Sequence, residues 1–199
     1  MRKPKFSAEV SLQFQKSRFL ALVFPVASPE GAREKLKELK HQYEDATHVV
    51  HAFITGKENS LTTGYSDDGE PPGTAGRPVF DVVRGQGATG IFVAVVRWFG
   101  GTKLGTGGLV KAYGDSAKAV LELVSWEEDL DWAEFTLNVD YSLYEPLRRA
   151  LELRSGKILE ETFGDQVTLR AQVLSTQRDE WTTWFQNASK GTGRIIFLV

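Results

Sequence analysis

The most informative segment of this chain reads Arg97-Trp98-Phe99-Gly100-Gly101-Thr102-Lys103-Leu104-Gly105-Thr106-Gly107-Gly108-Leu109. An almost continuous apolar run, residues 91–98, leads into it, and a helical pattern follows up to about Val124. Such an apolar run is typical of a strand buried on both faces. Glycine loses more conformational freedom on folding than any other residue, so clustered glycines predict a loop shaped for close backbone approach. We therefore expect a buried strand, a glycine loop and a helix, in that order.

A second glycine loop lies upstream and reads Ser66-Asp67-Asp68-Gly69-Glu70-Pro71-Pro72-Gly73-Thr74-Ala75-Gly76-Arg77-Pro78. It follows two predicted strands, residues 48–55 and 60–66, and precedes a helix expected to begin at Pro78. Thr74, or the turn around it, is the expected cap of that helix. Both glycine loops are therefore expected to connect a strand to a helix.

The remaining pattern predicts two domains. Residues 17–27 predict a buried strand and residues 29–43 a surface helix. The acidic run Glu127-Glu128-Asp129 interrupts the pattern and marks the expected boundary between domains 1–126 and 127–199. Beyond it the order is strand, helix, strand, strand, helix, strand, which is that of a ferredoxin-like unit. The expected fold class is therefore α+β with two domains.

Composition excludes several classes of protein. The 199 residues contain no cysteine, which removes disulfides, thiolate metal sites and cysteine nucleophiles. No apolar stretch approaches the roughly 20 residues that span a bilayer, and the amino end lacks the apolar core of a signal peptide. We therefore expect a cytoplasmic protein without a membrane partner. The net charge of -2 divides into an excess of 3 positive charges over residues 1–125 and of 5 negative charges over residues 126–199. Any nucleic-acid surface is thus expected in the first half, without readout of DNA sequence.

The loop that follows residues 91–98 is a candidate anion site. Its order of strand, glycines and helix exposes backbone N–H groups at a helix N-terminus, where an anion is favoured. The candidate contacts with an anion, RNA or a partner are Arg97, Gly100, Gly101, Lys103, Gly105, Thr106, Gly107, Gly108 and Lys111. The sequence lacks the G-x-x-x-x-G-K-[ST] pattern of nucleotide-hydrolysing P-loops. The alternative is structural, with glycines that let the loop pack flat against a neighbouring element.

The first glycine loop carries a cluster of carboxylates. Its candidate residues, as ligands or as structural groups, are Asp67, Asp68, Glu70 and Arg77. Three carboxylates could hold a divalent ion or supply an acid and a base. Alternatively, acids just before a helix stabilise its positive end and pair with a nearby cation such as Arg97 or Lys103. Because acids repel an anion, only the second loop is a candidate phosphate site.

Other patterns predict no cofactor, metal or catalytic set. Residues 85–90 match the dinucleotide pattern G-x-G-x-x-G, but a helix precedes them and a strand follows, the reverse of the required order. His48 and His51 lie three residues apart on a predicted strand and so point to opposite faces, which disfavours a zinc site. Trp98 and Phe99 could stack on bases, although the end of a buried strand also favours a core role. No Ser-His-Asp set can be argued from spacing.

Three strings of the chain, residues 66–76, 96–101 and 104–113, resemble the signature of the IMPACT family. His48 followed by Ala52 is also similar to the strand that precedes this signature. Val50 departs from the family pattern, because bacterial members are expected to carry cysteine there. The two-domain layout is similar to that of the bacterial branch of the family, called YigZ.

The resemblance implies a fold and a role. The first domain would be similar to the second domain of a small-subunit ribosomal protein and to a domain of elongation factor G; the second would be similar to the last domain of that factor. Eukaryotic members bind the large activator of the starvation-sensing kinase for initiation factor 2. The resemblance thus implies a non-enzymatic protein linked to regulation of translation, with RNA, the ribosome or a ribosome-associated protein as partner. Two alternatives stay open: a metal-assisted enzyme on a phosphorylated substrate, and a pure protein-interaction module.

Overall fold

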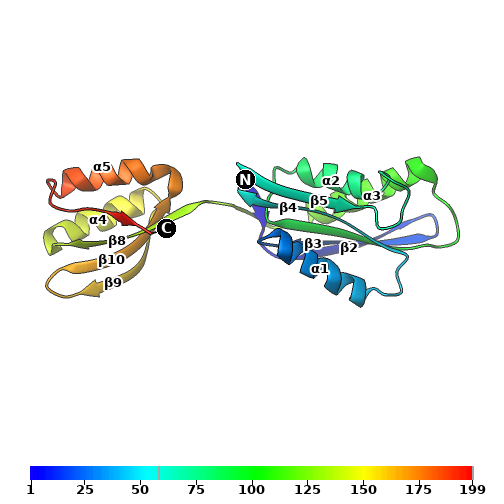
Figure 1. Cartoon of the computed structure of the whole chain (residues 1–199), viewed down its shortest axis with the longest axis horizontal. Coiled ribbons are helices and arrows are strands. Elements are labelled where there is room, and N and C mark those ends of the chain that lie inside the picture. Colours follow the sequence, from blue (N-terminus) through cyan, green and yellow to red (C-terminus); the bar gives the residue numbers. More distant parts are fainter. Residues whose placement is uncertain (58, 199) are drawn as a thin grey trace. The chain divides into compact units, whose positions relative to one another are not determined.

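The computed structural model describes residues 1–57 and 59–198. These form two compact units, Met1–Asp129 and Leu130–Val199, each built of helices packed on a sheet (Figure 1). The two-domain α+β class predicted from the sequence is therefore confirmed. In the part of the chain described here, no helix combines the length and the apolar character needed to cross a membrane.

A five-stranded antiparallel sheet in the order β2-β3-β6-β4-β5 forms the centre of the first unit. Helices α2 and α3 pack on one face and α1 on the other (Figure 1). The elements of this unit, in chain order, are β1 (Arg2–Pro4), β2 (Ala8–Phe14), β3 (Ser17–Pro25), α1 (Pro29–Gln42), β4 (His48–Lys57), β5 (Ser60–Ser66), α2 (Gly76–Arg84), β6 (Ile91–Trp98), α3 (Gly105–Glu122) and β7 (Trp126–Glu128).

Strand β6 is the central strand and is buried on both faces, as its apolar run predicts. Val93 and Val95 pack into the core beneath α2 and α3, whereas Ala94 and Val96 pack into the core beneath α1. Alternation along a strand sends successive side chains to opposite faces, and here both faces are covered. The second glycine loop therefore begins at the end of the central strand of the sheet.

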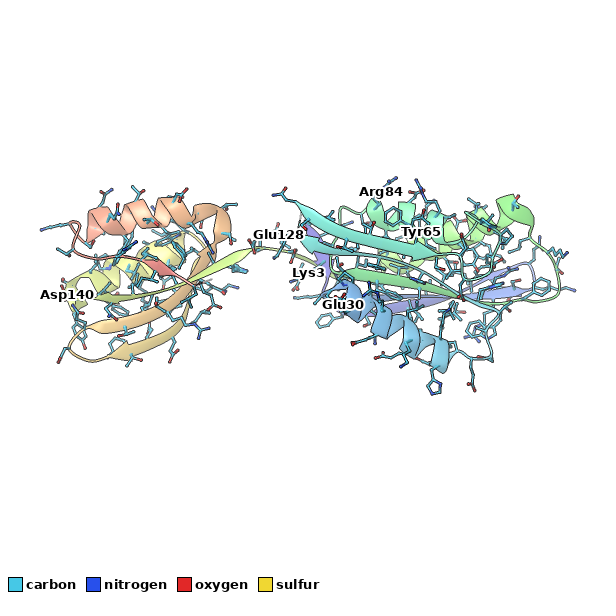
Figure 2. All side chains as sticks on the ribbon, in the orientation of Figure 1. Lys3, Glu30, Tyr65, Arg84, Glu128 and Asp140 are labelled. Carbon is cyan, nitrogen blue, oxygen red and sulfur yellow. The ribbon has the colours of Figure 1, made fainter. Side chains whose placement is uncertain are left out.

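Strands β1, β2 and β7 are absent from the sequence prediction. β2 pairs with β3 along its whole length, and its residues Val10 and Phe14 pack against the core beneath α2 and α3. β1 pairs with β7, so the first residues of the chain lie against the end of the unit. Figure 2 labels one residue of each of these two strands, Lys3 and Glu128.

The second unit has the ferredoxin-like order that the sequence predicts. Its antiparallel sheet has the order β11-β8-β10-β9, and α4 and α5 supply the other half of the core. Helix α4 begins after Asp140, which Figure 2 labels. The elements are β8 (Trp132–Val139), α4 (Tyr141–Leu153), β9 (Lys157–Phe163), β10 (Val167–Leu174), the short 3-10 helix η1 (Ser175–Gln177), α5 (Arg178–Ala188) and β11 (Ile196–Phe197).

Candidate functional site

A cavity of about 430 Å³ lies where the two glycine loops of the first unit meet. The first loop contributes Glu70 to its wall, and the second loop contributes Lys103. The ends of β4 and β6 contribute the side chains beneath them. The residues that line the cavity are Thr47, His48, Glu70, Pro71, Arg97, Phe99, Lys103, Leu104, Gly105, Thr106 and Leu109.

The N-terminus of α3 opens into this cavity. The residue at its N-cap position is Leu104, no side chain caps the helix, and its first turn carries no acidic residue. The first N–H groups of a helix lack partners within the helix and carry the positive end of its dipole. Gly105 and Thr106, which belong to this first turn, line the cavity. The cavity therefore presents backbone donors and a positive potential.

The N-terminus of α2 is closed by a carboxylate instead. Asp67 Oδ1 accepts hydrogen bonds from the backbone N–H groups of Ala75 and Gly76 at 3.0 and 2.8 Å, and Oδ2 accepts one from Gly73 at 2.9 Å. Burial alone would raise the pKa of Asp67, but these hydrogen bonds hold the pKa below its ordinary value. Asp67 thus satisfies the helix end that an anion would otherwise occupy.

The prediction that Thr74 caps α2 is therefore wrong, whereas the alternative that acids before this helix stabilise its positive end is confirmed for Asp67. The hydroxyl group of Thr74 donates to the carbonyl oxygen of Pro71 at 2.7 Å and makes no contact with the helix end. The helix also begins at Gly76 rather than at Pro78. The cap comes from much earlier in the loop because the chain folds back, which brings Ser66 and Asp67 against Gly76.

Glu70 forms a buried network with β6 and α3. Its Oε1 atom accepts a hydrogen bond from Arg97 Nη1 at 2.6 Å and another from the Tyr113 hydroxyl group at 2.7 Å. Arg97 is only 5% exposed, so its charge depends on this carboxylate for compensation. Burial and the hydrogen bond to Glu70 raise the pKa of Tyr113 far above its ordinary value, so this hydroxyl group stays protonated.

His48 lies beside this network with a fixed orientation. Its Nδ1 atom is 2.7 Å from the carbonyl oxygen of Asp68, and its Nε2 atom is 3.8 Å from Glu70 Oε1. A carbonyl oxygen only accepts, so Nδ1 carries the proton and the lone pair of the neutral ring is on Nε2. Burial would raise the pKa of Asp68, but its hydrogen bonds to Lys40 and the Val49 N–H hold the pKa below its ordinary value.

The three carboxylates of the first loop thus have separate structural partners. Asp67 caps α2, Asp68 pairs with Lys40, and Glu70 pairs with Arg97. Within residues 1–57 and 59–198, no group of three or more His, Cys, Asp or Glu side chains is placed to hold a metal ion. This geometry gives no support to a reaction in which these carboxylates hold a divalent ion.

The candidate cations differ in availability. Lys103 lines the cavity and has no ion-pair or hydrogen-bond partner in the described part of the chain. Arg97 lines it too but is paired with Glu70. Lys111 lies further along α3, outside the cavity, and pairs with Asp115 at 2.7 Å. Arg77 pairs with Asp81 along α2 at 2.9 Å, also outside the cavity.

The glycines of the second loop divide into two groups. A Cβ atom on Gly100 would lie 1.7 Å from the carbonyl oxygen of Lys16, so this glycine permits close packing against the turn between β2 and β3. Gly105, with φ of +73°, has no atom within 4 Å of such a Cβ atom, as is also true of Gly101 and Gly107. Gly108 packs against Leu104 and does not line the cavity. Close packing therefore explains Gly100, and in part Gly108, but not Gly101, Gly105 or Gly107.

Three residues that were not among the predicted contacts of the two loops belong to the site or lie beside it. Tyr113 reaches Glu70 from α3. His48 lines the cavity, whereas His51 stacks on Phe92 on the face covered by α1, which confirms that the two histidines point to opposite faces. Phe99 is 45% exposed and forms part of the wall. The sequence feature that could have identified Phe99 is its position beyond the last buried residue of β6.

Comparison with known proteins matches both units. The model of the Impact N-terminal domain matches residues 15–121, and that of a domain of unknown function (DUF1949) matches residues 137–192. The chain is similar to IMPACT family member YigZ of Escherichia coli (strain K12), with 31% identity over 98% of this chain and 96% of that protein. A crystal structure described as that of an hypothetical protein is 31% identical, covers 98% of this chain and 95% of its own, and has a TM-score of 0.68.

A eukaryotic relative matches about half of the chain. It is a protein IMPACT homolog of Schizosaccharomyces pombe (strain 972 / ATCC 24843), 33% identical over 108 residues, which are 52% of this chain and 38% of that protein. The family model, by contrast, covers more than half of the chain, and the bacterial relative covers nearly all of it. On these grounds the chain belongs to the IMPACT family.

Proposed function

We propose that this protein is a non-enzymatic binding protein of translation that holds an RNA phosphate group at the N-terminus of α3. The observation that carries the proposal is the open end of α3 within the cavity, with Lys103 beside it. Anions bind at such helix ends because backbone N–H groups and the helix dipole both favour negative charge. The closed end of α2 provides the internal comparison, because Asp67 already occupies the corresponding position there.

Membership of the IMPACT family supports the link to translation. The resemblance implies that eukaryotic members act on the pathway that shuts down translation. The match to the Impact N-terminal domain, residues 15–121, includes every residue that lines the cavity. We therefore assign the contact with RNA to the first unit.

The charges of the site determine how strongly it is expected to contribute to the salt dependence of RNA binding. Among the residues that the structure describes, Lys103 is the unpaired lysine that lines the cavity, since Arg97 is neutralised by Glu70. Each cation that neutralises a phosphate group releases counterions, and the binding constant then falls with added salt. One phosphate contact in a single strand corresponds to a slope of about -0.7 in log K against log salt.

A salt titration tests the proposal. We would measure the binding of the full chain to a fluorescent single-stranded RNA by anisotropy between about 50 and 200 mM salt. We expect Lys103→Ala to weaken binding and to flatten the slope by about 0.7 to 1. Lys111→Ala is the matched control on the same helix, because Lys111 is paired with Asp115 outside the cavity. Salt-independent binding, or equal slopes for Lys103→Ala and the unmodified chain, would refute the assigned site.

Capture from a native lysate separates RNA binding from a pure protein-interaction role. Partners that are released by nuclease treatment would be held through RNA, as we expect. Partners that remain after the treatment, and that Lys103→Ala does not weaken, would favour the protein-interaction module instead.

A further inference from the structure

The cavity at the start of α3 contains hydrogen-bond acceptors and an aromatic wall, which restrict its ligand more closely than an anion site alone does. We propose that it holds one ribonucleotide unit, with the phosphate group at the N-terminus of α3, a ribose hydroxyl group at His48 and Glu70, and the base against Phe99. This inference rests on the proposed function, because both concern the same cavity.

The part of the cavity that would hold the phosphate group contains hydrogen-bond donors without acceptors in the described part of the chain. Thr106 and Lys103 line the cavity beside the uncapped first turn of α3. Arg97 provides an independent indication, because its side chain lines the same cavity and is almost completely buried. Its Nε atom nevertheless has no hydrogen-bond partner in the described part of the chain. A buried N–H group without an acceptor is costly, and a ligand oxygen in the cavity would satisfy it once the side chain of Arg97 turns this buried atom toward the cavity.

The opposite end of the ligand must donate hydrogen bonds. When the ring of His48 is neutral, it offers a lone pair on Nε2, because Nδ1 donates to the carbonyl oxygen of Asp68. Glu70 lies 3.8 Å away, and both of its hydrogen bonds end on Oε1, which leaves Oε2 to accept from a ligand. Two acceptors side by side repel a phosphate or carbonyl oxygen but suit a hydroxyl group. The 2′-hydroxyl group of ribose is such a donor, and it distinguishes RNA from DNA.

The wall between these two ends is apolar and aromatic. Phe99 is 45% exposed although it directly follows the buried strand β6, and it lines the cavity together with Leu104 and Leu109. The guanidinium carbon of Arg97 lies 5.5 Å from the centre of the Phe99 ring. Exposed aromatic rings next to cationic groups stack on nucleic-acid bases. A ligand that presents a planar ring here covers apolar surface that is otherwise left in water.

The size of the cavity favours a single nucleotide unit. Its volume of about 430 Å³ lies within the range of roughly 300–1,000 Å³ that is usual for small-molecule sites. A duplex presents its phosphate groups on a convex surface and does not place a base inside a hollow. A single-stranded or terminal nucleotide can do so, because its base is free to leave the stack.

Calorimetric titration of the full chain with four probes tests the inference. The probes are adenosine 5′-monophosphate, 2′-deoxyadenosine 5′-monophosphate, ribose 5-phosphate and inorganic phosphate. We expect the ribonucleotide to bind more tightly than ribose 5-phosphate by roughly 5- to 100-fold, which is the effect of stacking one base. We expect the deoxy compound to bind more weakly than the ribonucleotide by roughly 2- to 10-fold, because one hydrogen bond is lost.

Two variants assign these effects to residues. Phe99→Leu should bring the ribonucleotide and ribose 5-phosphate to the same affinity without weakening ribose 5-phosphate, because it removes only the ring. Lys103→Ala should weaken all four probes alike, whereas Lys111→Ala should weaken none. Both lysines and Phe99 are exposed, so the fold should tolerate all three changes.

The outcomes separate this inference from the proposed function. Equal affinities for the ribonucleotide, its deoxy form and ribose 5-phosphate, with all three weakened by Lys103→Ala, would overturn the nucleotide inference and leave the phosphate site standing. Loss of base preference in Phe99→Leu together with a preference for ribose in the unmodified chain would support the inference. Failure of every phosphate-bearing probe to bind would overturn both.

Discussion

The carboxylate of Glu70 and the hydroxyl group of Tyr113 lie 2.7 Å apart, and this hydrogen bond joins the first glycine loop to α3. Arg97 joins the same carboxylate to the end of β6. Three segments distant in sequence are thus held at one buried point beneath the cavity. Because buried polar groups are costly unless they are paired, each member of this network affects both the stability of the first unit and the shape of the site.

Replacing Tyr113 by phenylalanine should alter alkaline stability. The pKa of the hydroxyl group is raised from its ordinary 10.0 by burial and by Glu70, so the folded chain holds this proton more tightly than the unfolded chain. The resulting stabilisation is complete below pH 10 and is lost as the pH rises above it. Tyr113→Phe should therefore be less stable at pH 7, by about 1–3 kcal/mol, but should lose less stability above pH 10. Urea unfolding at a series of pH values measures both; equal alkaline losses would contradict the assignment.

Breaking the ion pair of Glu70 and Arg97 should be more costly than replacing it. Glu70→Gln leaves the buried Arg97 charge unpaired, and we expect a loss of about 3–5 kcal/mol. Glu70→Gln combined with Arg97→Met removes the charge as well, so the double variant should be more stable than the sum of the two single losses predicts. A double-mutant cycle by urea unfolding measures this coupling. Strictly additive losses would show that the two side chains do not depend on each other.

Removing the cap of α2 should destabilise the first unit. Asp67→Ala should cost about 1–2 kcal/mol, as is usual for an N-cap carboxylate. Asp81→Ala, which removes two exposed ion pairs on the same helix, with Arg77 and Arg84, is the matched control and should cost less than about 1 kcal/mol. Equal effects of the two substitutions would argue against the cap.

The cap should also produce a pH dependence. The folded pKa of Asp67 lies below its ordinary 3.8, so its contribution is present above that pH and is lost as the pH falls through the folded pKa. Asp67→Asn cannot titrate. The stability difference between the unmodified chain and Asp67→Asn should therefore be constant above about pH 5 and should shrink below pH 4. A difference that grows on acidification would contradict this sign.

Two glycines of the second loop should respond oppositely to alanine. At Gly100 the added Cβ atom meets the carbonyl oxygen of Lys16 at 1.7 Å, so the backbone must shift, and we expect a loss of about 1–3 kcal/mol. At Gly107 the added atom meets nothing within 4 Å, and alanine should stabilise α3 by up to about 1 kcal/mol. Thermal unfolding of both variants checks the contrast. Similar losses at the two positions would mean that Gly107 also has a packing role.

Some of the fold followed directly from pattern. The apolar run of β6 predicted burial on both faces, and the spacing of His48 and His51 predicted opposite faces. The edge strand β2 was not predicted, although Ala8, Val10 and Leu12 alternate with polar residues. These apolar side chains are only half-buried in the structure. A count of period-two alternation would have found it.

The candidate site was less accessible from sequence. Arg97 was taken both as a cation available to an anion and, in the structural alternative, as a partner of the loop carboxylates. The structure shows the ion pair with Glu70, because a charge at the end of a strand covered on both faces is seldom left unpaired. Its partner Glu70 lies 27 residues away, and no local pattern links them. The sequence assigned the loop carboxylates to the start of α2 as an alternative but did not single out Asp67, because sequence patterns place a cap next to its helix, whereas Asp67 reaches Gly76 across a folded loop.

The turn between β2 and β3 has a consequence for any shortened form of this protein. Ser17 Oγ accepts from Arg97 Nη2 at 3.3 Å and from the Gly100 N–H at 3.4 Å, although Ser17 and Gly100 are 83 positions apart. A fragment that starts after β3 would retain every residue that lines the cavity. It would lose the hydrogen bonds that Arg97 and Gly100 donate to Ser17. The residues that line the cavity and the hairpin that supports them thus lie in separate stretches of the sequence, and the amino-terminal hairpin, which contributes no residue to the cavity wall, holds two residues of the second loop in place.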